Sequence, residues 1–124
     1  MILDGYIAKW KTYPEDEIKV RVARPHILSP SKDLLWKYKN GEIDWDEYTD
    51  LFNEEISDDP DKWLKIQELA ALSLDKDVRL ICYEKNPPCH RFILIDHINY
   101  INSPEGQKEQ KKYHDMLKSC RRVK

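Results

Sequence analysis

Glycine and cysteine are scarce in this chain of 124 residues, and each scarcity excludes a familiar class of protein. The three glycines are scattered, so no glycine-rich loop is available to hold a phosphate. Three cysteines are an odd number and too few for the disulfide scaffold of a small secreted protein. A nucleophile-elbow serine motif is absent. So is the Cys-x5-Arg loop of thiol phosphatases, because Pro88 and Ile95 occupy the positions where the arginine would follow Cys82 and Cys89.

Long apolar runs are missing as well. No stretch approaches the roughly 20 apolar residues of a membrane-spanning helix, and residues 1–6 lack the basic and apolar regions of a secretory signal. With 35% charged residues and few cysteines, the chain is expected to be cytoplasmic, with reduced thiols and no membrane contact. Its length predicts a single α/β domain over residues 1–103, followed by a C-terminal helix and basic tail over residues 104–124.

Charge is unevenly distributed, although the net charge is only -2. Residues 40–62 carry ten acids and one base, whereas residues 107–124 carry seven bases and two acids. Both are most simply interpreted as solvated helix faces. The alternative hypothesis is a non-catalytic module whose basic tail and Tyr113 contact nucleic acid. Four tryptophans and seven tyrosines are enough to supply a homo-oligomer interface, although most of them are expected in the core.

Hydrophobic periodicity predicts an α/β fold. Strands are expected at residues 1–10, 18–23 and 78–82. Helices are expected to begin at Ser29-Pro30, Asp44, Pro60, Cys89 and Ser103. A long helical crossover joins the second and third strands, so these two strands should be parallel. We therefore predict a small parallel or mixed sheet of about three or more strands, flanked by about five helices.

Reactive side chains are concentrated between the last strand and the helix that follows it. Residues 82–91 read Cys-Tyr-Glu-Lys-Asn-Pro-Pro-Cys-His-Arg. In an open α/β sheet such a junction lies at the carboxyl edge, where ligands usually bind. Arg21 and Arg24 end the second strand and are expected to approach the same edge. A helix N-terminus beside these cations favours a pocket for an anionic ligand, such as a phosphorylated or nucleotide-like molecule.

Cys89 is the candidate nucleophile or redox thiol, because a helix N-terminus, His90 and Arg91 all favour a thiolate. His90 or Glu84 is the candidate for proton transfer, and Arg91 for holding negative charge. Two alternatives stay open for the cysteines, namely structural burial and a Cys82–Cys89 disulfide. The sequence therefore decides neither whether the chain is an enzyme nor which cofactor it uses.

No metal site is predicted, although Cys82, Cys89 and His90 are suitable zinc ligands by type. Their spacing matches no common zinc pattern, and the adjacent Cys89 and His90 are expected to point in different directions. His97 lies about two helical turns after His90, so both imidazoles should share one helix face. A hydrogen-bonded packing role is the more usual one for such a histidine.

The segment at residues 80–87, followed by Cys-His-Arg at residues 89–91, resembles the domain-of-unknown-function family 488. Weaker support comes from residues 30–32 and 45–48. The resemblance covers most of residues 18–100 and implies a small α/β fold of uncharacterised biochemistry. Phe52 stands where many members of that family place a tyrosine. As site residues the resemblance marks Cys82, Glu84, Cys89, His90 and Arg91, with Tyr48 facing the same pocket.

Overall fold

A computed structural model describes residues 1–83, 89–109 and 111–112 of the chain. Within these residues one sheet contains three strands, β1 (Ile2–Tyr6), β2 (Ile18–Arg21) and β3 (Val78–Cys82). Their order is β1-β3-β2, and both pairings are parallel. Ile2 and Ile18 both lie opposite Val78, so the three strands begin in register. The predicted α/β class and the parallel pairing of the second and third strands are confirmed.

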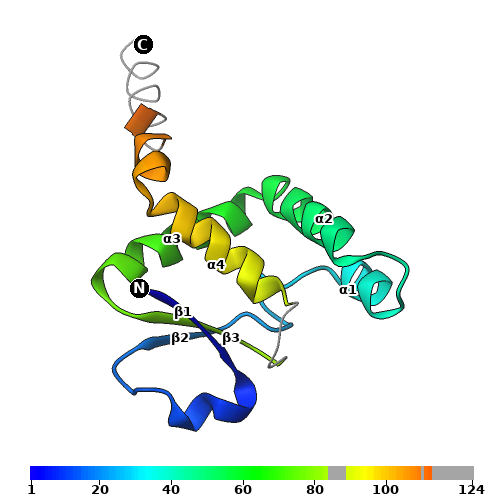
Figure 1. The fold of residues 1–124 in the computed structure, drawn as a ribbon, viewed down its shortest axis with the longest axis horizontal. Coiled ribbons are helices and arrows are strands. Elements are labelled where there is room, and N and C mark those ends of the chain that lie inside the picture. Colours follow the sequence, from blue (N-terminus) through cyan, green and yellow to red (C-terminus); the bar gives the residue numbers. More distant parts are fainter. Residues whose placement is uncertain (84–88, 110, 113–124) are drawn as a thin grey trace.

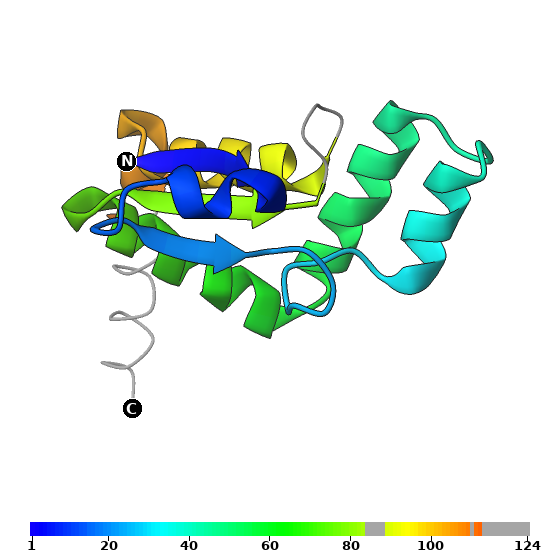
Figure 2. The same ribbon diagram turned by 90° about the horizontal axis from the view of Figure 1, so that it is seen from below.

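The apolar sequence of β3 explains its central place. Val78, Leu80 and Cys82 are buried in the main core, and Ile81 is fully buried as well. A strand with apolar residues on both sides needs cover on both faces of the sheet. Figure 2 shows helices α3 (Pro60–Asp75) and α4 (His90–Ile101) behind the strands, and the 3-10 helix η1 (Ile7–Thr12) in front of them.

The predicted first strand is too long, because β1 ends at Tyr6 and η1 follows it directly. Its pairing partner β3 ends at Cys82, opposite Tyr6, so no further ladder is available. The backbone N–H of Tyr6 is already bound by the Tyr13 hydroxyl, at 3.1 Å. The length of β1 depends on where its partner strand ends. The sequence of residues 1–10 carries no information about that partner.

The first helix, α1 (Lys32–Lys39), begins two residues later than predicted, with Ser31 as its N-cap. The Ser31 hydroxyl accepts a hydrogen bond from the Leu34 backbone N–H at 3.2 Å. Ser29, the predicted cap, instead donates its hydroxyl to the His26 carbonyl at 2.6 Å. Asp44, where the next helix was expected to begin, is the N-cap of α2 (Trp45–Ser57). α3 begins at Pro60 as expected, and Ser103 caps the last expected helix.

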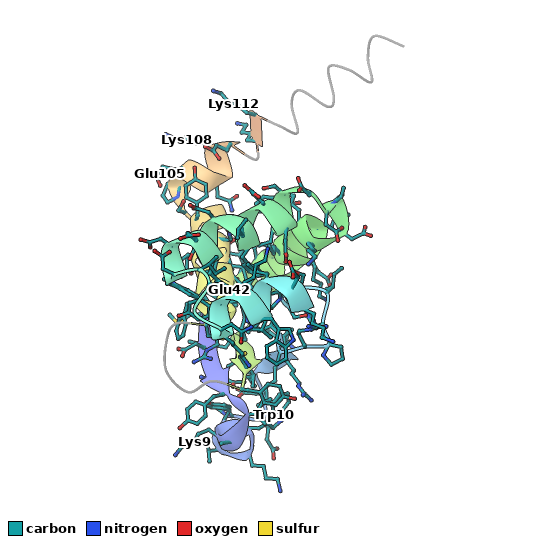
Figure 3. All side chains as sticks on the ribbon, turned by 90° about the vertical axis from the view of Figure 1, so that its right-hand side faces the viewer. Lys9, Trp10, Glu42, Glu105, Lys108 and Lys112 are labelled. Atoms are coloured by element: carbon teal, nitrogen blue, oxygen red, sulfur yellow. The ribbon has the colours of Figure 1, made fainter. Side chains whose placement is uncertain are left out.

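Helices α1 and α2 form a hairpin beyond the ends of the strands (Figure 1). All three strands point towards this hairpin (Figure 2), so it stands against the carboxyl edge of the sheet. Residues 104–109 and 111–112 are helical. Lys108 and Lys112 project from the body on the side away from Lys9 and Trp10 (Figure 3), and the rest of the basic tail, with Tyr113, lies outside the described residues. Within the described ranges, every helix is too short or too polar to cross a membrane.

Candidate functional site

A cavity of about 320 Å³ lies between the carboxyl edge of the sheet and the α1–α2 hairpin. Its walls come from the ends of β2 and β3, from the start of α4, and from the facing sides of α1 and α2. The lining residues are Ala23, Arg24, Pro30, Leu35, Tyr38, Lys39, Trp45, Tyr48, Cys82, Tyr83, Cys89 and His90. The strand-to-helix junction singled out in the sequence therefore opens onto this cavity.

Two thiols and one imidazole meet at one end of the cavity. The Sγ atoms of Cys82 and Cys89 lie 4.0 Å and 3.7 Å from Nδ1 of His90. All three side chains are buried, and both cysteines are thiols in the structure. β3 supplies Cys82 at its last position, while Cys89 is the N-cap of α4 and His90 its first residue. The sequence order strand–loop–helix is therefore what brings these three groups together.

The orientation of the His90 ring is fixed by a backbone group. Nε2 of His90 lies 2.8 Å from the carbonyl oxygen of Val22, just after β2. Since a carbonyl oxygen can only accept, Nε2 must carry the hydrogen of this bond. In the neutral imidazole Nδ1 is then an acceptor, and it faces both thiols. Three segments, namely the end of β2, the end of β3 and the start of α4, thus determine this arrangement.

The expectation that Cys89 and His90 point apart is wrong, because the two side chains converge. Cys89 has extended backbone angles, φ -150° and ψ 145°, while His90 begins the helix. The divergence of about 100° per residue applies to neighbours within a helix, not across its cap. The change from extended to helical backbone turns the two side chains to the same side.

Cys82 is held as a protonated thiol. Its hydrogen bond with Cys89 is the main cause that raises the pKa of Cys82 far above the usual value, and burial acts in the same direction. The contact with His90 lowers the pKa and offsets only part of this rise. At neutral pH Cys82 is consequently a hydrogen-bond donor rather than a thiolate.

An aromatic row forms the wall that faces the thiols. Trp45 stacks on Tyr48, with ring centroids 5.0 Å apart and planes at 16°, and Tyr38 meets Trp45 edge to face at 5.7 Å. The row continues through Phe52, which packs against Tyr48 and meets the His90 ring edge to face at 5.7 Å. Tyr48 therefore lies on the cavity side where the resemblance placed it.

Positive charge lines the outer part of the cavity. Arg24 follows β2, Lys39 ends α1, and both belong to the lining. Arg21 lies outside the lining but donates to the hydroxyl of Tyr83, which is part of it. Among the lining residues that the structure describes there is no carboxylate. The described part of the lining therefore carries positive charge and no negative charge.

Arg91 and Glu84 are two further predicted site residues that are not among the described residues of the cavity lining. Arg91 is completely buried, and its Nη2 lies 3.9 Å from Oδ2 of Asp4 on β1. Its guanidinium also covers the Phe92 ring at 4.5 Å, and it does not belong to the cavity lining. Glu84 lies outside the described residues. Ligand contact by Arg91 and proton transfer by Glu84 both stay predictions.

Sequence reasoning missed several residues of the cavity. Tyr38 and Lys39 at the end of α1, and Trp45 at the start of α2, face the junction only because the hairpin folds against the strand ends. The acidic, turn-forming residues 40–44 between Lys39 and Trp45 do not reveal that these two side chains face the junction. The Asn40-Gly41 stop signal, with aromatic residues on both sides, was the available clue. The contact between the Val22 carbonyl and His90 uses a backbone group, so no pattern of side chains in the sequence predicts it.

His97 lies on α4, the helix that begins at the site, and its protonation should make the stability of the fold sensitive to acid. Its Nε2 lies 2.7 Å from Oδ1 of Asn53 on α2, as the expected packing role requires. Burial lowers the pKa of His97, and Asp96 raises it only in part. The folded state thus binds fewer protons than the unfolded state, whose value is about 6.5, so stability should fall as the pH drops below that value.

Denaturant unfolding measured between neutral and mildly acid pH checks this expectation. In the His97→Gln variant part of the decline in unfolding free energy should be lost. His26 should contribute to the remaining decline, because its pKa is also lowered, chiefly by burial and then by the charges of Lys65 and His90. An identical pH profile in the two proteins contradicts the prediction.

Comparison with known families supplies one match. The family model described as the active DUF488-N3 subclade, DUF488-N3a, matches residues 11–102. This range contains β2, β3, all four helices α1–α4 and every described residue that lines the cavity. No curated protein and no solved structure matches the chain significantly.

Proposed function

The chain belongs to the DUF488 family, within its active DUF488-N3 subclade, and from this premise we propose that its cavity binds a nucleotide-like anion. The family match confirms the resemblance seen at residues 80–91, but it names no reaction. One observation carries the proposal. A stacked aromatic wall and two cations meet in a single cavity that ends at two thiols and an imidazole.

The two kinds of wall match the two parts of such a ligand. Trp45 and Tyr38 meet edge to face and both line the cavity. A base that stacks on an aromatic ring gains about 1–3 kcal/mol. Arg24 and Lys39 offer charge-assisted hydrogen bonds to a phosphate. The volume of about 320 Å³ lies at the lower end of the usual range for ligand sites. A mononucleotide or a smaller phosphorylated aromatic compound suits this space better than a dinucleotide.

The reactive end of the cavity suits chemistry on the bound molecule. Cys89 and His90 are close enough for proton exchange, with 3.7 Å between Sγ and Nδ1. Cys82 Sγ lies 4.0 Å from the same Nδ1 atom. The subclade's description as active agrees with a reacting site rather than purely structural cysteines. Thiol-dependent chemistry on the ligand is therefore the finer part of the proposal.

Removal of either lining cation should weaken nucleotide binding. For Arg24→Ala and for Lys39→Ala we expect the affinity for a nucleoside monophosphate to fall about tenfold to a hundredfold, since a hydrogen bond to a charged group contributes about 1.5–3 kcal/mol. Titration calorimetry, or quenching of Trp45 fluorescence, measures the change. Inorganic phosphate should bind more weakly than the nucleotide, because it gains nothing from the aromatic wall.

Lys37→Ala is the matched control. Lys37 lies on the same helix as Lys39 but pairs with Asp33 on the solvent side and takes no part in the lining. Equal affinities in wild type, Arg24→Ala and Lys39→Ala overturn the proposal. Removal of residues 113–124 should leave nucleotide affinity unchanged. If it abolishes binding instead, the alternative of a nucleic-acid module built on the basic tail is favoured.

A further inference from the structure

We propose that Cys82, Cys89 and His90 form a Zn²⁺ site whose fourth coordination position opens into the cavity. The donor atoms of these three residues lie within 4.8 Å of one another, and all three residues are buried. Two thiolates and one imidazole are the donor types that zinc prefers in proteins. The inference rests on these donors and their surroundings, and it is independent of whether the cavity binds a nucleotide.

The distances are close to those of a metal site. Bonds of about 2.3 Å from zinc to sulfur and about 2.0 Å to nitrogen place tetrahedral donor atoms roughly 3.6 Å apart. Nδ1 of His90 is already 3.7 Å from Cys89 Sγ and 4.0 Å from Cys82 Sγ. All three donor atoms lie within 4.8 Å of one another, so the approach needed for coordination is on the scale of side-chain rotations.

The orientation of His90 is the second supporting observation. Histidines that bind a metal through one ring nitrogen commonly donate the other N–H to a carbonyl or carboxylate. Nε2 of His90 donates to the Val22 carbonyl at 2.8 Å. Nδ1 is left with its lone pair aimed at the two sulfur atoms. An imidazole held in this way can accept either a thiol hydrogen or a metal ion at Nδ1.

Charge balance also favours the ion. Zn²⁺ displaces the thiol protons of Cys82 and Cys89 when it binds, and these protons are released to solvent. The resulting site of two thiolates and a neutral imidazole has no net charge, so its burial avoids the high cost of an unpaired buried ion. Softer donors of this kind favour zinc over magnesium or calcium, which prefer oxygen ligands. The chemistry of the donor set and its burial therefore point to the same metal.

The cavity determines what kind of zinc site this would be. Structural zinc sites are closed by four protein ligands, whereas catalytic sites have three and leave a position for water or substrate. All three donors belong to the lining of the cavity. The open position thus faces the space in which a ligand binds. There the metal can polarise a ligand oxygen or bind a water molecule as a source of hydroxide.

The first test uses the wild-type full-length chain. Reduced, chelator-treated protein is titrated with Zn²⁺ against a chromophoric chelator, and separately with Co²⁺. We expect about one metal ion per chain. The Co²⁺ protein should show thiolate-to-metal charge-transfer bands and the intense visible bands of a tetrahedral site. X-ray absorption of the zinc form should show two sulfur ligands. Octahedral Co²⁺ spectra without sulfur, or no retained metal, overturn the proposal.

Variants locate the site. Loss of a supporting residue outside the coordination shell lowers metal affinity roughly 10–100-fold. Each of the ligand variants Cys82→Ser, Cys89→Ser and His90→Ala should lower zinc affinity by more than that. Cys120→Ser removes a thiol that is not part of the trio, and it should bind zinc like wild type. Unchanged affinity in both Cys82→Ser and Cys89→Ser places the metal elsewhere and overturns the assignment.

Alkylation separates this proposal from that of nucleotide binding. Bound Zn²⁺ should protect Cys82 and Cys89 from alkylation in folded wild-type protein, as read by mass spectrometry, while Cys120 gives an internal reference. Equal labelling with and without Zn²⁺, or a Cys82–Cys89 disulfide that persists in reductant, contradicts the zinc site. Neither outcome affects nucleotide binding, which the Arg24 and Lys39 variants test by themselves.

Discussion

Replacement of Phe52 by alanine is expected to lower the free energy of unfolding by about 3–5 kcal/mol. The Phe52 side chain is fully buried, stacked on Tyr48 at 6.1 Å and set edge to face against His90 at 5.7 Å. Alanine would remove both ring contacts and leave a void between α2 and α4 that rigid neighbours can only partly fill. Urea denaturation of wild type and variant measures the loss.

Phe52→Leu is the informative companion variant. Leucine fills most of the same volume, so its cost should be clearly below that of alanine. Both variants lose the edge-to-face contact that holds one side of the His90 ring, so both should weaken metal binding at His90 relative to wild type. If alanine costs less than about 1 kcal/mol, the ring is not an essential part of the core. Stability and metal affinity are separate measurements, so packing and site effects can be told apart.

The location of the site could be predicted because it depends on local order along the chain. A buried strand that ends at Cys82 and a helix that begins at His90 must place the intervening junction at the carboxyl edge of a parallel sheet. The same reasoning placed Arg24 near that edge, where it lines the cavity. Both results follow from strand direction, which the long helical crossover between the second and third strands determines.

What the sequence could not predict depends on the backbone conformation at one helix cap and on partners distant along the chain. The convergence of Cys89 and His90 follows from the extended cap conformation of Cys89, and it removes the main objection to a metal at this site. The end of β1 depends on where β3 stops. Ser31 caps α1 while its hydroxyl and N–H contact the Glu55 carboxylate on α2, which residues 29–31 alone do not reveal.

The ion pair between Glu17 and Arg79 is the clearest case of such a long-range partner. These residues lie 62 positions apart and form two hydrogen bonds, from Nε at 2.5 Å and from Nη2 at 3.1 Å. Arg79 also donates to the Asp4 carbonyl at 2.7 Å and covers the Tyr13 ring at 4.1 Å. A Cβ at Gly5 would lie 2.8 Å from Cδ of Arg79, so a glycine is needed beside the guanidinium stem.

We expect Glu17→Ala to lower the free energy of unfolding by about 2–3 kcal/mol. The Glu17 side chain is only 2% exposed and that of Arg79 16%. Loss of the carboxylate therefore leaves a largely buried guanidinium without its charge partner, which costs up to about 3–5 kcal/mol when both groups are fully buried. The partial exposure of Arg79 reduces the expected cost. Denaturant unfolding at neutral pH measures it.

Asp16→Ala is the matched control, since it removes the same charge from an exposed neighbouring residue. Its effect should stay within about 0.5 kcal/mol. The double variant Glu17→Leu with Arg79→Leu should recover part of the loss, because no unpaired ion remains buried. An equal loss in Glu17→Ala and Asp16→Ala would mean that this face of the sheet is held by the Tyr13 and Asp4 contacts of Arg79 rather than by its carboxylate.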